Sequence, residues 1–210
     1  MNPEPAPAAA PSLIHPLSSL VEPLDIGRLF TRAQPLEVEL GSGDGSFLAR
    51  YAALHSGRNF IGVERLLGRL RKLDRKGARL GLTNLRCVRI EASYFLEYLL
   101  PPAAAQALHI YYPDPWPKRR HHKHRLINER FPLLAGKVLA PGGTVYLRTD
   151  DAGYFERMRA VFGACAGGFV EVPVPAELAG IETDFERGFL QRGIPVLRLA
   201  YQWTGRLTRQ

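Results

Sequence analysis

The chain has 210 residues, enough for one α/β domain with a substantial buried core. Its hydrophobic content of 46% and charged content of 23% are ordinary for a globular protein, and no apolar run reaches the ~18 residues of a membrane span. The formal net charge of +8 favours a polyanionic partner, and two cysteines exclude a disulfide framework. We therefore expect a cytoplasmic protein that does not bind a membrane.

Residues 1–34 differ in composition from the rest of the chain. Residues 1–11 are rich in Pro and Ala and lack the basic and apolar regions of a secretion signal. Residues 12–34 contain Pro16, Pro23 and Gly27, which interrupt any long helix. We expect residues 1–34 to form a partly disordered N-terminal tail and residues 35–210 to form a single domain.

From residue 36 onward, short β-type segments alternate with amphipathic helical segments. Strands are expected at 36–40, 60–63, 85–90, 108–112, 144–147, 196–201 and, despite a proline, 169–174. Helices are expected at 46–54, 65–80, 124–139 with a break near Pro132, and 154–164, with a turn at 141–143. This alternation predicts an α/β fold with a parallel sheet and right-handed crossovers.

A glycine-rich turn follows the first of these strands. Gly41, Gly43 and Gly45 permit a tight turn and a close approach of a ligand to the backbone ahead of a helix. Glu39 precedes the turn and Asp44 lies within it, which disfavours a pyrophosphate ligand. A ligand that carries ammonium and sulfonium charges suits these acids better.

Carboxylates stand at the ends of four successive strands: Glu39, Glu64, Glu91 and Asp114. The carboxyl ends of parallel strands share one edge of a sheet, where open α/β folds bind their ligands. Glu64 stands where an acid accepts hydrogen bonds from both hydroxyls of a ribose. The glycine turn and the four acids together predict a site for S-adenosylmethionine.

A stiff and basic segment follows the fourth strand. Three prolines alternate with Asp114 and Trp116, and residues 118–125 then contain five Lys or Arg and three His. We expect this segment to grip the phosphates of a nucleic acid. Lys118 is expected to reach a guanine O6 or a phosphate. Contacts with the phosphates of the nucleic-acid backbone are expected from Arg119, Arg120, Lys123 and Arg125. The three His lack a nearby Cys or carboxylate, so no metal site is expected.

Taken together, these segments resemble one known family, the bacterial tRNA (guanine-N7)-methyltransferases. The likeness rests on PDPWPKRRHHKHRL at 113–126, ELGSGDG at 39–45, GVE at 62–64, NLR at 84–86, RTD at 148–150 followed by Tyr154, and TDFE at 183–186. The resemblance implies a Rossmann-like class I methyltransferase fold. Such a fold has a seven-stranded, mostly parallel sheet with one antiparallel strand and helices on both faces.

The resemblance also implies roles for individual residues. It implies S-adenosylmethionine contacts from Glu39, Glu64, Glu91 and Asp114, and Asp114 is the catalytic position. The family usually has Asp where this chain has Glu91, and the longer side chain can still reach the adenine amino group. Substrate contacts are implied for Lys118, Asp150, Thr183, Asp184, Phe185 and Glu186. The implied substrate is N7 of a guanine in tRNA, at position 46 of the variable loop.

Several alternatives stay open. A methyltransferase for a small molecule or a protein would share the glycine turn, and a non-catalytic RNA-binding module would share the basic segment. A nicotinamide dehydrogenase would have its third glycine at residue 46, which is Ser here. Thr183 and Glu186 match a capping box at a helix start, and Asp150 matches a cap for the helix of Tyr154. The sequence does not distinguish a monomer from a homodimer.

Overall fold

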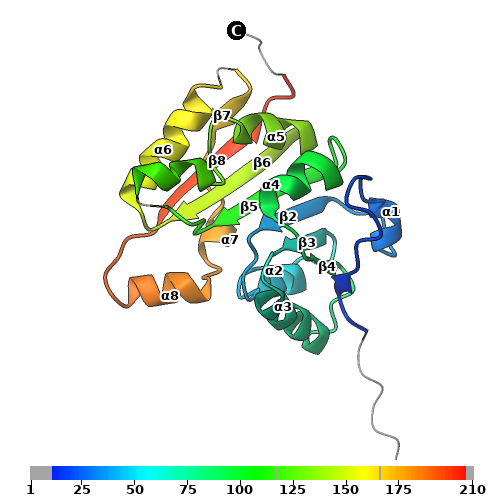
Figure 1. Cartoon of the computed structure of the whole chain (residues 1–210). Coiled ribbons are helices and arrows are strands. Elements are labelled where there is room, and N and C mark those ends of the chain that lie inside the picture. The colour runs from blue at the N-terminus through cyan, green and yellow to red at the C-terminus, as the bar shows by residue number, and fades with distance from the viewer. Residues whose placement is uncertain (1–10, 117, 166, 207–210) are drawn as a thin grey trace, which may run out of the picture.

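The computed structural model describes residues 11–116, 118–165 and 167–206, except for the side chain of Arg119. An eight-stranded sheet in the order β1-β4-β3-β2-β5-β6-β8-β7 runs through its centre (Figure 1). Strand β8 is antiparallel to both of its neighbours, and the other neighbouring strands are parallel. The strands are β1 (Ile14–His15), β2 (Leu36–Leu40), β3 (Asn59–Val63), β4 (Leu85–Val88), β5 (Ala105–Tyr111), β6 (Leu139–Thr149), β7 (Phe169–Glu171) and β8 (Leu197–Trp203).

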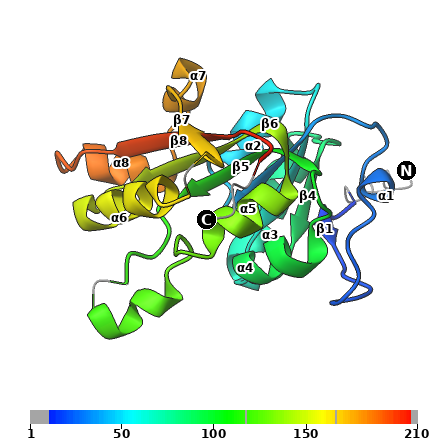
Figure 2. The same ribbon diagram turned by 90° about the horizontal axis from the view of Figure 1, so that it is seen from above.

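Helices cover both faces of this sheet. Helices α5 and α6 pack on one face together with α4 and a π-helical turn, and α7 lies on the other face (Figure 2). The buried side chains of α2 and α3 belong to the same hydrophobic cluster as that of α7. The helices are α1 (Ile26–Leu29), α2 (Leu48–Leu54), α3 (Leu67–Arg79), α4 (Ala92–Tyr94), the π-helical turn η1 (Phe95–Leu99), the 3-10 helix η2 (Arg119–His124), α5 (Phe131–Val138), α6 (Ala152–Gly163), α7 (Ala176–Ala179) and α8 (Asp184–Leu190).

Strand β2 has an apolar face and an acidic face because successive side chains of a strand point to opposite sides. Val38 and Leu40 belong to the core under α4, α5 and α6. Glu37 and Glu39 are buried toward the opposite face. Strand β5 pairs in parallel with β2, with His109 opposite Glu39, so the loops that follow both strands leave the sheet at one edge. This edge lies beside α8 (Figure 1).

The predicted α/β fold with one antiparallel strand is confirmed, but the sheet has eight strands and not seven. The additional strand β1 and helix α1 lie within residues 1–34, which were expected to be a tail. Leu13, Leu29 and Phe30 of this segment are buried. A two-residue strand has no hydrophobic period to detect, which explains why the sequence did not reveal it. Residues 1–10 lie outside the described residues.

Two further expectations about local structure were wrong. The single helix expected at 124–139 is replaced by η2 and α5, and Pro132 lies in the first turn of α5, where its missing N–H breaks no hydrogen bond. Residues 141–143, expected to be a turn, lie inside β6, at a register shift where β6 bulges against β5. Strand β7 is also shorter than expected and ends at Glu171.

Candidate active site

The turn at residues 41–45 joins β2 to the segment before α2. Its glycines all adopt the left-handed conformation, with φ of 79° at Gly41, 55° at Gly43 and 76° at Gly45. A Cβ atom on Gly45 would lie 2.3 Å from Cδ1 of Leu73, because α3 packs directly on the turn. A Cβ atom on Gly41 would meet no atom within 4 Å. One side of the turn is therefore packed against α3, and the side at Gly41 is open to a ligand.

Glu64 is buried directly after β3 and holds the turn in place. Its Oε2 accepts a hydrogen bond from the backbone N–H of Gly43 at 3.2 Å, and its Oε1 accepts one from Leu66 at 2.8 Å. A carboxylate has about four acceptor positions, so two bonds leave lone pairs free. Glu64 therefore retains lone pairs that can accept further hydrogen bonds.

Glu39 brings a buried carboxylate oxygen without a partner to the same edge. Its side chain is 4% exposed, and Oε2 has no hydrogen-bond partner in the described part of the chain. Burial raises the pKa of Glu39 well above its usual value; the charge of Arg148 opposes this rise, and the charges of Asp44 and Glu64 add to it. A cationic ligand group would compensate this carboxylate. This buried carboxylate therefore suits a ligand with an ammonium group.

Asp44, inside the turn, is neutralised by the protein itself. Lys76 Nζ of α3 donates to Oδ2 of Asp44 at 2.9 Å, and the N–H of Ser46 donates to Oδ1 at 3.2 Å. Burial acts to raise the pKa of Asp44, but the hydrogen bond and charge of Lys76 bring it below its usual value. Asp44 therefore fastens the glycine turn to α3.

The two other expected acids follow β4 and β5 at this edge of the sheet. Glu91 is exposed, and its Oε2 accepts a hydrogen bond from the N–H of Tyr94 at 2.8 Å, which caps α4. Asp114 is exposed as well. Burial raises the pKa of Tyr154 to about 12, and the charge of Asp114 contributes to this rise. Arg125 contacts both Pro115, the neighbour of Asp114, and the ring of Tyr154, which places this loop near the first turn of α6.

The loop that carries Asp114 is strained and braced. Tyr112 and Trp116 have φ of 53° and 43°, which is uncommon for residues other than glycine. Arg125 Nε donates to the backbone oxygen of Pro115 at 2.6 Å, and its guanidinium lies 4.8 Å from the centroid of the Tyr154 ring. Arg125 therefore braces the loop through Nε, and its expected phosphate contact stays a prediction.

The rest of the basic segment faces solvent. Lys118, Arg120 and Lys123 are exposed, and the side chain of Arg119 lies outside what the structure describes. The green segment that includes η2 extends away from the sheet in Figure 2. Next to it is a surface cavity of about 680 Å³. The cavity is lined by His122, Lys123, Arg125, Ile127, Asn128, Glu129, Gly153 and Arg157. Its charge suits an anion.

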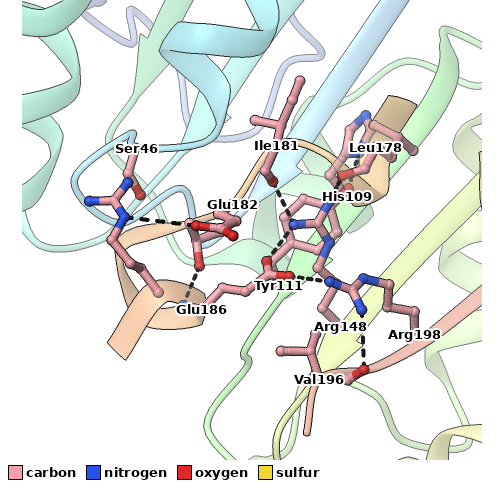
Figure 3. A network of polar contacts seen from close by, with 12 residues as sticks. Ser46, His109, Tyr111, Arg148, Leu178, Ile181, Glu182, Glu186, Val196 and Arg198 are labelled. Carbon is pink, nitrogen blue, oxygen red and sulfur yellow. Dashed lines mark hydrogen bonds and ion pairs between the residues drawn. The ribbon is translucent and has the colours of Figure 1, made fainter. Parts of the chain in front are cut away.

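The segment 183–186 contributes two buried and two exposed side chains. Thr183 Oγ1 accepts a hydrogen bond from the N–H of Glu186 at 3.0 Å and caps α8. The Glu186 side chain is completely buried and paired with Arg148 and Arg198 (Figure 3), so it does not reach a substrate as expected. Asp184 and Phe185 are exposed. The N–H of Asp184 donates to Ser46 Oγ at 3.1 Å, which joins α8 to the glycine turn.

Arg148 of β6 fixes this segment to the sheet. It was considered only as part of the RTD motif and was assigned no role from the sequence. The side chain is 2% exposed, and its guanidinium donates to the backbone oxygens of Ile181 and Leu178 (Figure 3). It also lies 4.1 Å from the centroid of the Tyr111 ring. A single Arg in an otherwise apolar strand is a signal that could have identified it, because a buried charge needs a partner.

A second buried network lies beneath the pocket and was also not predicted. Nε2 of His109 lies 2.7 Å from Oε2 of Glu37, and Nδ1 lies 2.8 Å from the hydroxyl of Tyr111. Arg58 donates to the other oxygen of Glu37 at 2.7 Å. Burial acts to raise the pKa of Glu37, but His109 and Arg58 bring it below its usual value. These contacts hold β2 and β5 side by side at the pocket.

Asp150 is half-buried at the end of β6. The cap of α6 is its neighbour Asp151, whose Oδ1 accepts a hydrogen bond from the N–H of Tyr154 at 2.6 Å. The capping role considered for Asp150 therefore belongs to Asp151. The charge of Asp150 contributes to a raised pKa of Tyr112, whose largest cause is burial. Asp150 thus lies near the loop that carries Asp114.

No group of three His, Cys, Asp or Glu residues in the described ranges is arranged to hold a metal ion. None of the helices in these ranges is long and apolar enough to cross a membrane.

Comparison with known proteins agrees with this geometry. A family model described as "Putative methyltransferase" matches residues 33–199. The tRNA (guanine-N(7)-)-methyltransferase of Syntrophotalea carbinolica is 35% identical over 178 residues, which cover 83% of this chain and 77% of that protein. The enzyme of the same name from Geobacter metallireducens is 40% identical over 146 residues, which cover 70% of this chain and 69% of that protein.

Solved structures support the fold. The crystal structure of the 16S rRNA methyltransferase KamB is 19% identical to this chain, with a TM-score of 0.62, and the match covers 87% of this chain and 94% of that one. At this identity the likeness concerns the fold alone. The family model and the curated relatives decide the family: the chain belongs to the bacterial tRNA (guanine-N7)-methyltransferases.

Proposed function

We propose that this protein transfers the methyl group of S-adenosylmethionine to N7 of a guanine in tRNA. The observation that carries the proposal is the position of two features on neighbouring strands. The glycine turn with Glu39 follows β2, and the loop with Asp114 and the basic segment follows β5. We assign the donor site and the RNA-facing surface to this one edge of the sheet. A cytoplasmic location goes with this proposal, because tRNA is found there.

The residues of the pocket fit S-adenosylmethionine group by group. The open side at Gly41 and Gly43 allows close approach to the backbone, and Glu39 would accept hydrogen bonds from the ammonium group. Glu64 would accept from the ribose hydroxyls, and Glu91 would accept from the adenine amino group. When bound, the cofactor supplies an electrophilic methyl group.

Asp114 has a role that follows from the chemistry of guanine. N7 has an in-plane lone pair and no proton, so no general base is needed to activate it. Methylation makes the purine positively charged. We assign Asp114 to the stabilisation of this developing charge, because a preorganised carboxylate stabilises a cationic transition state. The strained backbone at Trp116 and the brace from Arg125 hold the loop that positions Asp114.

The exposed cations would hold the tRNA. We propose that Lys118 contacts guanine O6 or a phosphate and that Arg119, Arg120 and Lys123 contact phosphates. The cavity beside Lys123 offers one such anion site. Asp184 and Phe185 are exposed at the N-terminal end of α8, next to the glycine turn. Asp150 lies near Tyr112. We propose that these three residues contact the target nucleotide. The resemblance favours guanine 46 of the variable loop.

The proposal is tested with purified protein, labelled S-adenosylmethionine and unmodified tRNA. We expect label in the tRNA and, after digestion to nucleosides, in N7-methylguanosine. A matched reaction with a protein mixture in place of tRNA should remain unlabelled. Label in a different nucleoside, or in the protein mixture alone, would overturn the proposal.

A further inference from the structure

Helix α3 is strongly basic, and the function proposed above does not use this charge. Its sequence LGRLRKLDRKGAR contains six Lys or Arg residues and one Asp. The single acid points inward: Asp74 Oδ1 accepts a hydrogen bond from the N–H of Leu13 at 2.7 Å, and Oδ2 accepts one from Ser12. The outward surface of α3 is therefore cationic.

Four exposed side chains of α3 form a row, which we call the α3 stripe: Arg69, Lys72, Arg75 and Arg79. They are three or four positions apart, which places them on one side of the helix. At a rise of 1.5 Å per residue, the row is about 15 Å long. Figure 1 shows α3 at the lower surface of the molecule beside α2. The stripe is long enough to meet several phosphates of a nucleic acid.

No carboxylate compensates the charge of the stripe. Like charges three or four residues apart destabilise a helix. Within the described ranges, none of the four side chains has a carboxylate within 4.0 Å, and the ion pairs of α3 are those of Lys76 with Asp44 and Asp184. Arg79 Nε donates to the backbone oxygen of Arg75 at 3.3 Å, near the C-terminal end of α3. A row of uncompensated cations on a helix is best explained by a polyanionic partner.

The stripe lies on the opposite side of the donor pocket from the basic segment. Helix α3 follows β3, and the basic segment follows β5; these two strands flank β2, which leads into the glycine turn. Helix α3 touches that turn through Leu73 at Gly45 and through Lys76 at Asp44. The α3 stripe and the basic segment therefore lie on either side of the proposed donor site at the glycine turn.

We infer that the α3 stripe is a second tRNA-binding surface, which takes backbone phosphates from a part of the tRNA beyond the target guanine. This inference rests on the proposed function. A folded RNA that reaches the pocket would extend past it on both sides, so one cationic surface would meet each side. Binding to the stripe is expected to be electrostatic and independent of sequence.

The test is a variant with Arg69→Gln, Lys72→Gln and Arg75→Gln. Gln preserves helix propensity, so α3 should remain folded, which circular dichroism can verify. The control removes the same charge elsewhere, with Arg28→Gln, Arg159→Gln and Arg206→Gln, all exposed. The readout is the salt dependence of tRNA affinity, together with KM and kcat for methyl transfer.

Each lost phosphate contact reduces the magnitude of the slope of log K against log salt by about 0.7–0.9. We expect a reduction of about 2 to 3 for the α3 variant, a raised KM for tRNA, unchanged kcat at saturating tRNA and unchanged S-adenosylmethionine affinity. The control should keep the wild-type slope. An Arg69→Lys, Arg75→Lys variant, which retains the charge, should keep it too.

If the α3 variant and the control bind tRNA alike while the wild type methylates tRNA, the inference is wrong and the proposed function stands. If the wild type does not methylate tRNA in the same assay, the proposed function fails, and this inference fails with it.

Discussion

Arg148 and Glu186 form an ion pair of 2.8 Å in which both side chains are almost completely buried (Figure 3). The pair joins β6 to α8, and Arg198 of β8 contacts the same carboxylate. Segment 176–190 is thus fixed to the sheet by a buried network, and its exposed residues Asp184 and Phe185 are presented next to the glycine turn.

Loss of the Glu186 carboxylate should therefore destabilise the whole protein. Glu186→Ala removes the carboxylate that pairs with Arg148 and Arg198. Breaking a buried ion pair in this way costs about 3–5 kcal/mol, because it leaves a buried charge without a partner. We expect a decrease of this size in the free energy of unfolding measured with urea. Glu156→Gln is the control: its pair with Arg159 is 3.8 Å long and exposed, so the change should stay below about 1 kcal/mol. Equal effects in the two variants would contradict the structural role of Glu186.

The pKa of Glu39 predicts a pH dependence of donor binding. Because burial raises this pKa, the free protein retains a proton on Glu39 at pH values where an ordinary glutamate is ionised. A cationic donor favours the ionised form, so binding should expel that proton. The affinity for S-adenosylmethionine should therefore fall as the pH is lowered through this pKa. Calorimetry in buffers of different ionisation enthalpy measures the released proton directly.

Glu39→Gln supplies the control for this experiment. The variant should bind the donor more weakly and lose both the proton release and the pH dependence. An unchanged pH profile in Glu39→Gln would show that another group titrates on binding.

Asp114→Asn should slow chemistry without weakening donor binding. The amide preserves the size of the side chain but removes the charge that stabilises the cationic purine. Loss of one preorganised group costs about 10²–10³ in rate. We expect a decrease of this size in the single-turnover rate with saturating tRNA, and an unchanged affinity for S-adenosylmethionine. A wild-type single-turnover rate in this variant would refute the role of Asp114.

Gly45→Ala should disrupt the contact between the glycine turn and α3. The added Cβ would lie 2.3 Å from Leu73 Cδ1, and φ at this position is 76°. The steric overlap and the positive φ both destabilise the folded variant. Thermal unfolding should therefore shift to a lower temperature, and the affinity for S-adenosylmethionine should fall. Gly57→Ala is the matched control, because a Cβ there meets nothing within 4 Å. A control that unfolds as early as Gly45→Ala would exclude this explanation.

The sequence predicted the parts of the molecule that have a local signature. Strand β2 was expected at its observed limits, Leu36–Leu40, because a short β-type segment there ends at a cluster of glycines. The glycine turn was expected because three glycines stand at alternate positions, and the positive φ angles observed at all three favour glycine. Glu39 and Glu64 were expected at the carboxyl ends of their strands, and they lie at the ends of β2 and β3.

Contacts between residues distant in sequence could not be predicted in this way. Thr183 and Glu186 match a local capping pattern, and the Thr183 half of it occurs. The Glu186 side chain, however, pairs with Arg148, 38 residues away, and this partner depends on how α8 folds over β6. The bond from Arg125 to Pro115 was likewise not predicted, because a charge run gives no sign that one of its members also braces a loop.

The most direct test of the account replaces one atom of the substrate. A tRNA transcript made with 7-deazaguanosine has a C–H group where guanine has N7, and it retains the phosphate backbone and the O6 group. We predict that this transcript binds with the affinity of ordinary tRNA and inhibits the reaction, but accepts no methyl group. Methyl transfer to it at the rate of ordinary tRNA would contradict the claim that guanine N7 is the acceptor.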